Sequence, residues 1–63
     1  MQKNTFIVEA ARGFWKVFQA DIRNFASVHS TKALALSHAM ELCQSKDKIK
    51  VLRQDGSVEM EFG

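Results

Sequence analysis

The chain has 63 residues, of which 46% are apolar and 25% charged, and its formal net charge is +2. This size predicts one domain, residues 1–63, with a single core. No apolar run approaches the roughly 20 residues of a membrane span, and no signal segment is expected. The single cysteine, Cys43, excludes an internal disulfide, so we expect a cytoplasmic protein without a membrane role.

The first half of the chain predicts three strands, because it is rich in β-branched and aromatic residues. We place these strands at residues 5–9, 14–20 and 25–29, joined by a loop at 10–13 and a turn at 21–24. Side-chain alternation then puts one apolar set on a common face. Its members are Phe6, Val8, Trp15, Val17, Ala26 and Val28.

The middle of the chain predicts the only helix, over about residues 31–45. Either Thr31 or Ser30 suits the N-cap, because a hydroxyl there can accept a free amide proton of the first turn. Five apolar residues fall on one stripe at helical spacing. They are Ala35, Leu36, Ala39, Leu42 and Cys43.

The last part of the chain predicts a hairpin. Asp55 and Gly56 separate two alternating runs, which is typical of a type I′ turn. This turn places Lys50 opposite Glu61 on one face, beside Leu52 and Glu59. The other face is apolar and contains Ile49, Val51, Val58, Met60 and Phe62.

Packing these apolar surfaces together predicts a two-layer α+β domain with the order β-β-β-α-β-β, in which Trp15 is the largest core contributor. The fourth strand should run parallel to the first and the fifth antiparallel to it. Antiparallel neighbours are commoner, so we expect a mainly antiparallel sheet with the spatial order third, second, first, fifth, fourth.

Five segments together resemble a family of small bacterial proteins, domain of unknown function 2188. They are Gly13-Phe14-Trp15-Lys16-Val17, Arg23-Asn24-Phe25-Ala26-Ser27, His29-Ser30-Thr31-Lys32, Ala35-Leu36 with Ala39, and Gln54-Asp55-Gly56-Ser57-Val58. The chain departs from the family pattern at Phe14, which separates Gly13 from Trp15, and at Leu34, where the family usually has an acidic residue. The resemblance implies the same small α+β fold and no catalytic residue.

No motif of an enzyme or a cofactor site is present. The residues that could carry chemistry are His29, His38, Cys43 and the carboxylates, and they match no metal or nucleophile spacing. We therefore expect a non-catalytic protein without a cofactor, a metal or a small-molecule substrate. Both histidines are expected to be polar surface residues, and Cys43 a small buried apolar residue.

The sheet face away from the helix is the candidate binding surface, because alternation puts large apolar and basic residues there. Its proposed contact residues are Ile7, Phe14, Lys16, Phe18, Phe25 and Leu52, with His29 and Lys50 nearby. The favoured hypothesis is that this face binds a protein partner or forms a homodimer. An origin in a phage or prophage would favour a small inhibitor protein. The alternative is nucleic acid, with phenylalanines stacking on bases and Lys16, Lys50 and Arg23 binding phosphates. If one strand register differs by a residue, or if loops and termini cover this face, neither the protein interface nor the nucleic-acid surface would exist.

Overall fold

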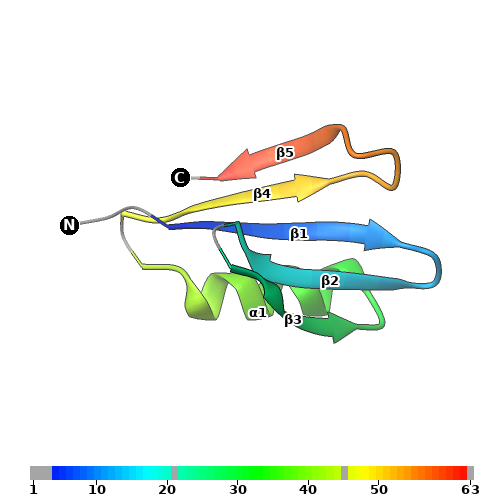
Figure 1. Cartoon of the computed structure of the whole chain (residues 1–63), viewed down its shortest axis with the longest axis horizontal. Coiled ribbons are helices and arrows are strands. Elements are labelled where there is room, and N and C mark those ends of the chain that lie inside the picture. Colours follow the sequence, from blue (N-terminus) through cyan, green and yellow to red (C-terminus); the bar gives the residue numbers. More distant parts are fainter. Residues whose placement is uncertain (1–3, 21, 45, 63) are drawn as a thin grey trace.

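The computed structural model describes residues 4–20, 22–44 and 46–62, without the side chains of residues 22–26. It is a small α+β fold in which one helix packs on a five-stranded mixed sheet (Figure 1). The elements follow the predicted order β-β-β-α-β-β. They are β1 (Thr5–Ala11), β2 (Phe14–Gln19), β3 (Ile22–His29), α1 (Lys32–Leu42), β4 (Lys48–Leu52) and β5 (Val58–Phe62).

The first hairpin keeps its predicted faces although its loop is shorter than expected. Ala11 pairs with Phe14, so only Arg12 and Gly13 form the loop, and Gly13 has a φ of 79°. Glycine reaches this left-handed conformation at no steric cost. The register differs from the predicted one by two residues, and such a shift preserves which side chains share a face. Val8 and Val17 therefore still meet on the helix side.

The prediction for β3 was wrong by one residue. Val17 pairs with Ser27 rather than with Val28, and Trp15 pairs with His29. A one-residue change turns every side chain of a strand to the other face, so Val28 lies on the outer face. The cause is an irregularity between Phe18 and Gln19 within the β2–β3 pair, where a simple turn was expected. Asp21, the start of that predicted turn, lies outside the described residues.

The helix begins as predicted and ends early. The Thr31 hydroxyl accepts a hydrogen bond from the Leu34 backbone N–H at 3.2 Å, which confirms the N-cap. Ala35 and Ala39 are fully buried, so these small side chains bring the helix backbone close to the sheet. The helix ends at Leu42, which was expected in the buried stripe but is 42% exposed.

The second hairpin confirms three predicted pairs and corrects the turn. Lys50 pairs with Glu61, with Val51–Met60 and Ile49–Phe62 on either side. Gly56 has a φ of 91°, but no described residue other than glycine has a positive φ, so the type I′ turn was wrong.

A turn closed by the Gly56 N–H and the Arg53 carbonyl, 2.9 Å apart, leads instead into a bulge. Leu52 pairs with Val58 rather than with Glu59, which becomes the extra residue. The side chain of Glu59 therefore points to the helix side. The sequence had predicted Val58 on that side and Glu59 on the outer face.

The strand order corrects a further prediction. The sheet has the order β3-β2-β1-β4-β5, in which β4 is the neighbour of β1 and runs parallel to it, as expected from the chain direction. The expected exchange of β4 and β5 is wrong. The observed pairing sets Ile49 beside Phe6 and Val51 beside Val8, and all four side chains are buried. Burial of this apolar block outweighs the general preference for antiparallel neighbours.

The core lies between α1 and the β1, β2 and β4 strands. Val8 and Val51 are its largest fully buried side chains. Trp15 is half-buried and packs against the edge of this core. The helix packs mainly against β1, β2 and β3, and Figure 1 shows β5 at the edge of the sheet that is farther from it.

Candidate functional site

The centre of the outer sheet face is closed to solvent. Ile7 pairs with Phe18 on this face, and the two side chains are only 8% and 7% exposed. Neither belongs to the core under the helix. Sequence reasoning placed both residues on the correct face but expected them to be available for a partner. In this conformation both side chains are packed within the molecule and leave little surface for a partner to contact.

Three of the remaining proposed contact residues, Phe14, Lys16 and Leu52, lie nearer the turn that joins β1 to β2. Phe14 is 36% exposed, and Lys16 and Leu52 are half-buried. The side chain of Phe25 lies outside the described residues. Sequence reasoning missed Val28, which is 62% exposed and pairs with Lys16, because it assigned this residue to the helix side.

Paired residues on the outer face form one row across all five strands. We call it the outer row and define it as Val28, Lys16, Glu9, Leu52 and Val58, taken from β3 to β5. The row is apolar at both ends and charged in the middle. Phe14 precedes Lys16 by two residues on the same face, and so adds an aromatic ring beside the row.

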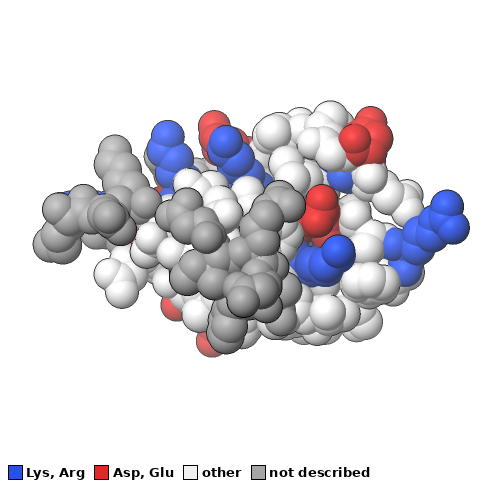
Figure 2. Space-filling model, in the orientation of Figure 1, with Lys and Arg blue, Asp and Glu red and all other residues white. Residues whose placement is uncertain are grey.

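Two lysines of the outer face have acidic neighbours. Lys16 pairs with Glu9 across β1 and β2. Lys50 lies 3.8 Å from Glu61, which is the cross-strand pair that the sequence predicted. On the side of the molecule seen in Figure 2, Lys and Arg side chains are interspersed with Asp and Glu and gather into no single basic area. A local balance of charge disfavours a phosphate-binding surface.

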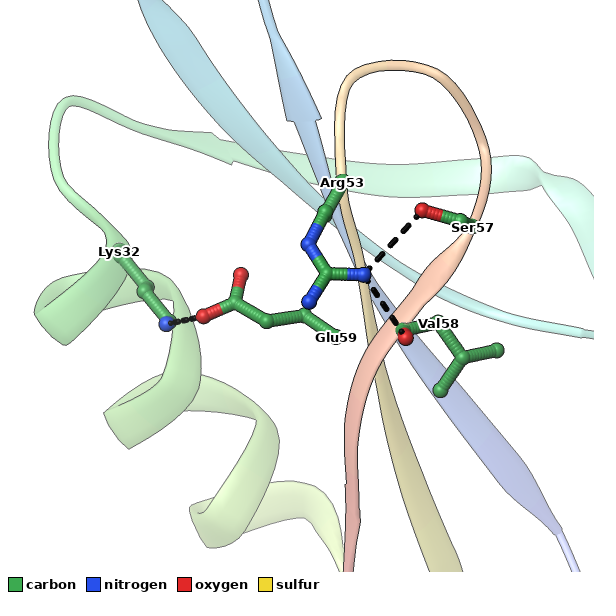
Figure 3. A network of polar contacts seen from close by, with 5 residues as sticks. All are labelled: Lys32, Arg53, Ser57, Val58 and Glu59. Carbon is green, nitrogen blue, oxygen red and sulfur yellow. Dashed lines mark hydrogen bonds and ion pairs between the residues drawn. The ribbon is translucent and has the colours of Figure 1, made fainter.

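On the helix side, an ion pair joins the first residue of α1 to β5. Lys32 donates a hydrogen bond to the Glu59 carboxylate (Figure 3). This bond, with the nearby charges of Lys32 and Arg53, lowers the pKa of Glu59. Arg53 itself donates to the Ser57 hydroxyl and the Val58 carbonyl, at 3.3 and 3.2 Å. Sequence reasoning had put Glu59 on the outer face. The bulge moves its side chain to the helix side, and the alternation of apolar and polar residues does not reveal a bulge.

Two apolar residues of β5 stay partly uncovered on the helix side. Met60 and Phe62 are each 40% exposed, although the sequence predicted both for the core. They lie opposite Val51 and Ile49, which are buried. Because α1 packs mainly against β1, β2 and β3, it does not bury the outermost strand.

The two histidines come together between β3 and α1. The ring centroids of His29 and His38 lie 4.9 Å apart, and His29 Nε2 lies 3.1 Å from the Ser27 hydroxyl oxygen. Both side chains are half-buried, whereas the sequence predicted independent surface residues. The shift of β3 explains the difference, because it carries His29 to the helix side.

Two observations bear on metal binding and on thiol reactivity in the described part of the chain. Among the described residues, no three His, Cys, Asp or Glu residues are grouped to hold a metal ion. Burial, followed by the charge of Asp47, raises the pKa of the Cys43 thiol, and a raised pKa disfavours the nucleophilic thiolate.

No helix in the described part of the chain is long and apolar enough to cross a membrane. Comparisons with protein-family models, curated proteins and solved structures found no significant match to this chain.

Proposed function

We propose that this protein is a non-catalytic interaction module that binds a protein partner, or a second copy of itself, through the outer row and Phe14. The observation that carries the proposal is the exposure of Phe14, Val28 and Val58, at 36%, 62% and 49%. Their backbones belong to paired strands, so the apolar side chains are presented on a fixed surface. Exposed apolar residues that are held rigidly favour protein association. A relationship to domain of unknown function 2188 is part of this proposal.

The charges of the face favour a protein over nucleic acid. Lys16 and Lys50 would have to neutralise phosphates, but each has a glutamate beside it in the sheet, Glu9 and Glu61. A nucleic acid would therefore meet nearly as much negative as positive charge. A protein partner can instead pair with both signs and bury the apolar ends of the row.

The test is photo-crosslinking in cells with a photoreactive amino acid in place of Phe14. We expect a discrete crosslinked protein, which excess unlabelled wild-type chain removes and excess Phe14→Ser chain does not. The control places the same group at Ser37, an exposed position on the helix, where no such product should form. Equal products at both positions, or removal by both competitors, would contradict the proposal.

The nucleic-acid alternative is separated by a salt titration with mixed single-stranded and double-stranded nucleic acid. Binding to phosphates weakens steeply as salt rises, because counterions are released on association. We expect no such binding, and a steep salt dependence that is lost in Lys16→Ala would assign the face to nucleic acid. Light scattering of the purified protein without nucleic acid tests the second copy, because self-association raises the measured mass.

A further inference from the structure

In the described part of the chain, the β5 strand has one side of its backbone without a neighbouring strand. It lies at the end of the sheet order and pairs with β4 alone among the described strands. The bulge at Glu59 distorts only the beginning of β5, and Met60, Glu61 and Phe62 keep a regular register. Backbone N–H and C=O groups along a free edge can pair with an added strand.

The side chains of β5 indicate what such a strand should contain. Met60 and Phe62, each 40% exposed, face the helix side. Glu61 lies between them on the outer face, with its side chain 50% exposed and its ion pair to Lys50 at 3.8 Å. The edge therefore presents the alternating pattern apolar, acidic, apolar.

The chain itself contains the complement of this pattern. On the occupied side of β5, β4 sets Val51, Lys50 and Ile49 opposite Met60, Glu61 and Phe62. The internal partner of β5 is thus an apolar-basic-apolar strand, and its lysine matches the acidic residue.

We propose that the free edge of β5 binds an extended segment of another protein with this same chemistry. The segment has Lys or Arg opposite Glu61 and apolar residues opposite Met60 and Phe62. A second copy of β5 is a poorer occupant. An antiparallel pair that sets Met60 against Phe62 of the other copy would put the two Glu61 residues opposite each other, and like charges in this position destabilise a sheet. This site is separate from the outer row.

The test uses two synthetic peptides and isotope-labelled protein. The first peptide has the sequence of residues 47–53, and the second carries Lys50→Glu in the same sequence. We expect the first to shift the amide resonances of Met60, Glu61 and Phe62 and to slow their hydrogen exchange. The second peptide should bind about tenfold more weakly than the first or not at all, because its glutamate lies opposite Glu61.

A charge exchange in the protein completes the experiment. Glu61→Lys should reverse the preference, so that the Lys50→Glu peptide binds better than the first peptide. The control Glu41→Lys makes the same charge change at an exposed helix position and should keep the original preference. Because Glu61→Lys sets a lysine opposite Lys50, folding of both variants is checked from unchanged resonances of β1 and β2 and from protected amides in the β4–β5 pair.

Several results would overturn the proposal. They are an unchanged preference in Glu61→Lys, shifts confined to Phe14 and Val28, and shifts that spread through β1, which would mean that the peptide replaces β4. A dimer held by β5 that binds neither peptide would assign the edge to a second copy. The crosslinking at Phe14 is independent of all these outcomes.

Discussion

At the scale of single residues, Asp47 links the segment between α1 and β4 to the start of β1, which is distant in sequence. Its carboxylate accepts hydrogen bonds from the backbone N–H of Asn4 at 3.1 Å and of Gln44 at 2.9 Å. Asn4 in turn accepts from the Lys48 backbone N–H at 2.9 Å. The start of β1, the exit from α1 and the start of β4 are thus fixed together around a side chain that is 8% exposed.

The first prediction concerns this carboxylate. Asp47→Ala leaves two backbone N–H groups without their acceptor, so we expect the free energy of unfolding to fall by about 1–3 kcal/mol. Urea denaturation measures the change. Glu41→Ala, at an exposed helix position, is the control and should differ little from the wild type. A wild-type midpoint for Asp47→Ala would show that water replaces the carboxylate without cost.

A second residue-scale prediction concerns pH and Glu59. The Lys32 hydrogen bond lowers its pKa below the ordinary value of 4.5 in the folded chain, so the unfolded chain binds the proton more readily. The ionised Glu59 therefore stabilises the folded chain. This stabilisation is complete above pH 4.5 and is lost as the pH falls below that value. We expect Glu59→Gln to depend less on pH than the wild type. Denaturation midpoints from neutral pH to below 4.5 measure this, and parallel curves would contradict the ion pair.

At the scale of the elements, hydrogen bonds inside a turn decide where the bulge of the second hairpin lies. The Asp55 carboxylate accepts from the Ser57 backbone N–H at 2.9 Å and from its hydroxyl at 2.7 Å. These bonds lower the pKa of Asp55, and its backbone does not have the positive φ that a type I′ turn requires. In this turn only Gly56 has the left-handed conformation. The β4–β5 register then shifts by one residue, and Glu59 is the unpaired residue of the resulting bulge.

The third prediction tests this turn. A Cβ at Gly56 would meet no atom within 4 Å, so the cost of substitution is backbone strain at its φ of 91°. We expect Gly56→Ala to lower the free energy of unfolding by about 1–2 kcal/mol. Gly56→Asn should cost less, because Asn tolerates this conformation better. Equal costs, measured by denaturant titration, would indicate that the turn relaxes to another conformation.

At the scale of the whole molecule, the distance between the layers is set by two alanines. Ala35 and Ala39 are both fully buried against the sheet, in the same core as Val8 and Val51. A larger side chain at either position has no free volume to occupy and would push α1 away from the sheet.

The fourth prediction follows from this spacing. Ala39→Leu should lower the free energy of unfolding by about 1–3 kcal/mol or prevent folding, because the packed core must move to admit it. Ala33→Leu makes the same change on the exposed side of α1 and should lie within about 0.5 kcal/mol of the wild type. Thermal unfolding compares the two, and a stable Ala39→Leu would mean that the layers are loosely packed.

The features that depend on neighbours along the chain could be predicted from the residues alone. Thr31 capped the helix, Gly13 and Gly56 took positive φ, and alternation set the faces of β1, β2 and β4. These features rest on local hydrogen bonds and on side-chain period, and both can be read within a few residues. For the candidate site, the same reasoning put Phe14 and Lys16 on the outer face.

The choice of neighbouring strands and the burial of each side chain depend on contacts between distant parts of the chain. The pairing of β4 with β1 buries Ile49 and Val51 beside residues more than forty positions away, and no local pattern ranks that gain against an antiparallel neighbour. The irregularity before β3 and the bulge at Glu59 each change a register, which reverses the faces of Val28, His29 and Glu59. Burial of Ile7 and Phe18 is likewise a property of the assembled sheet, because the side chains around them come from different strands.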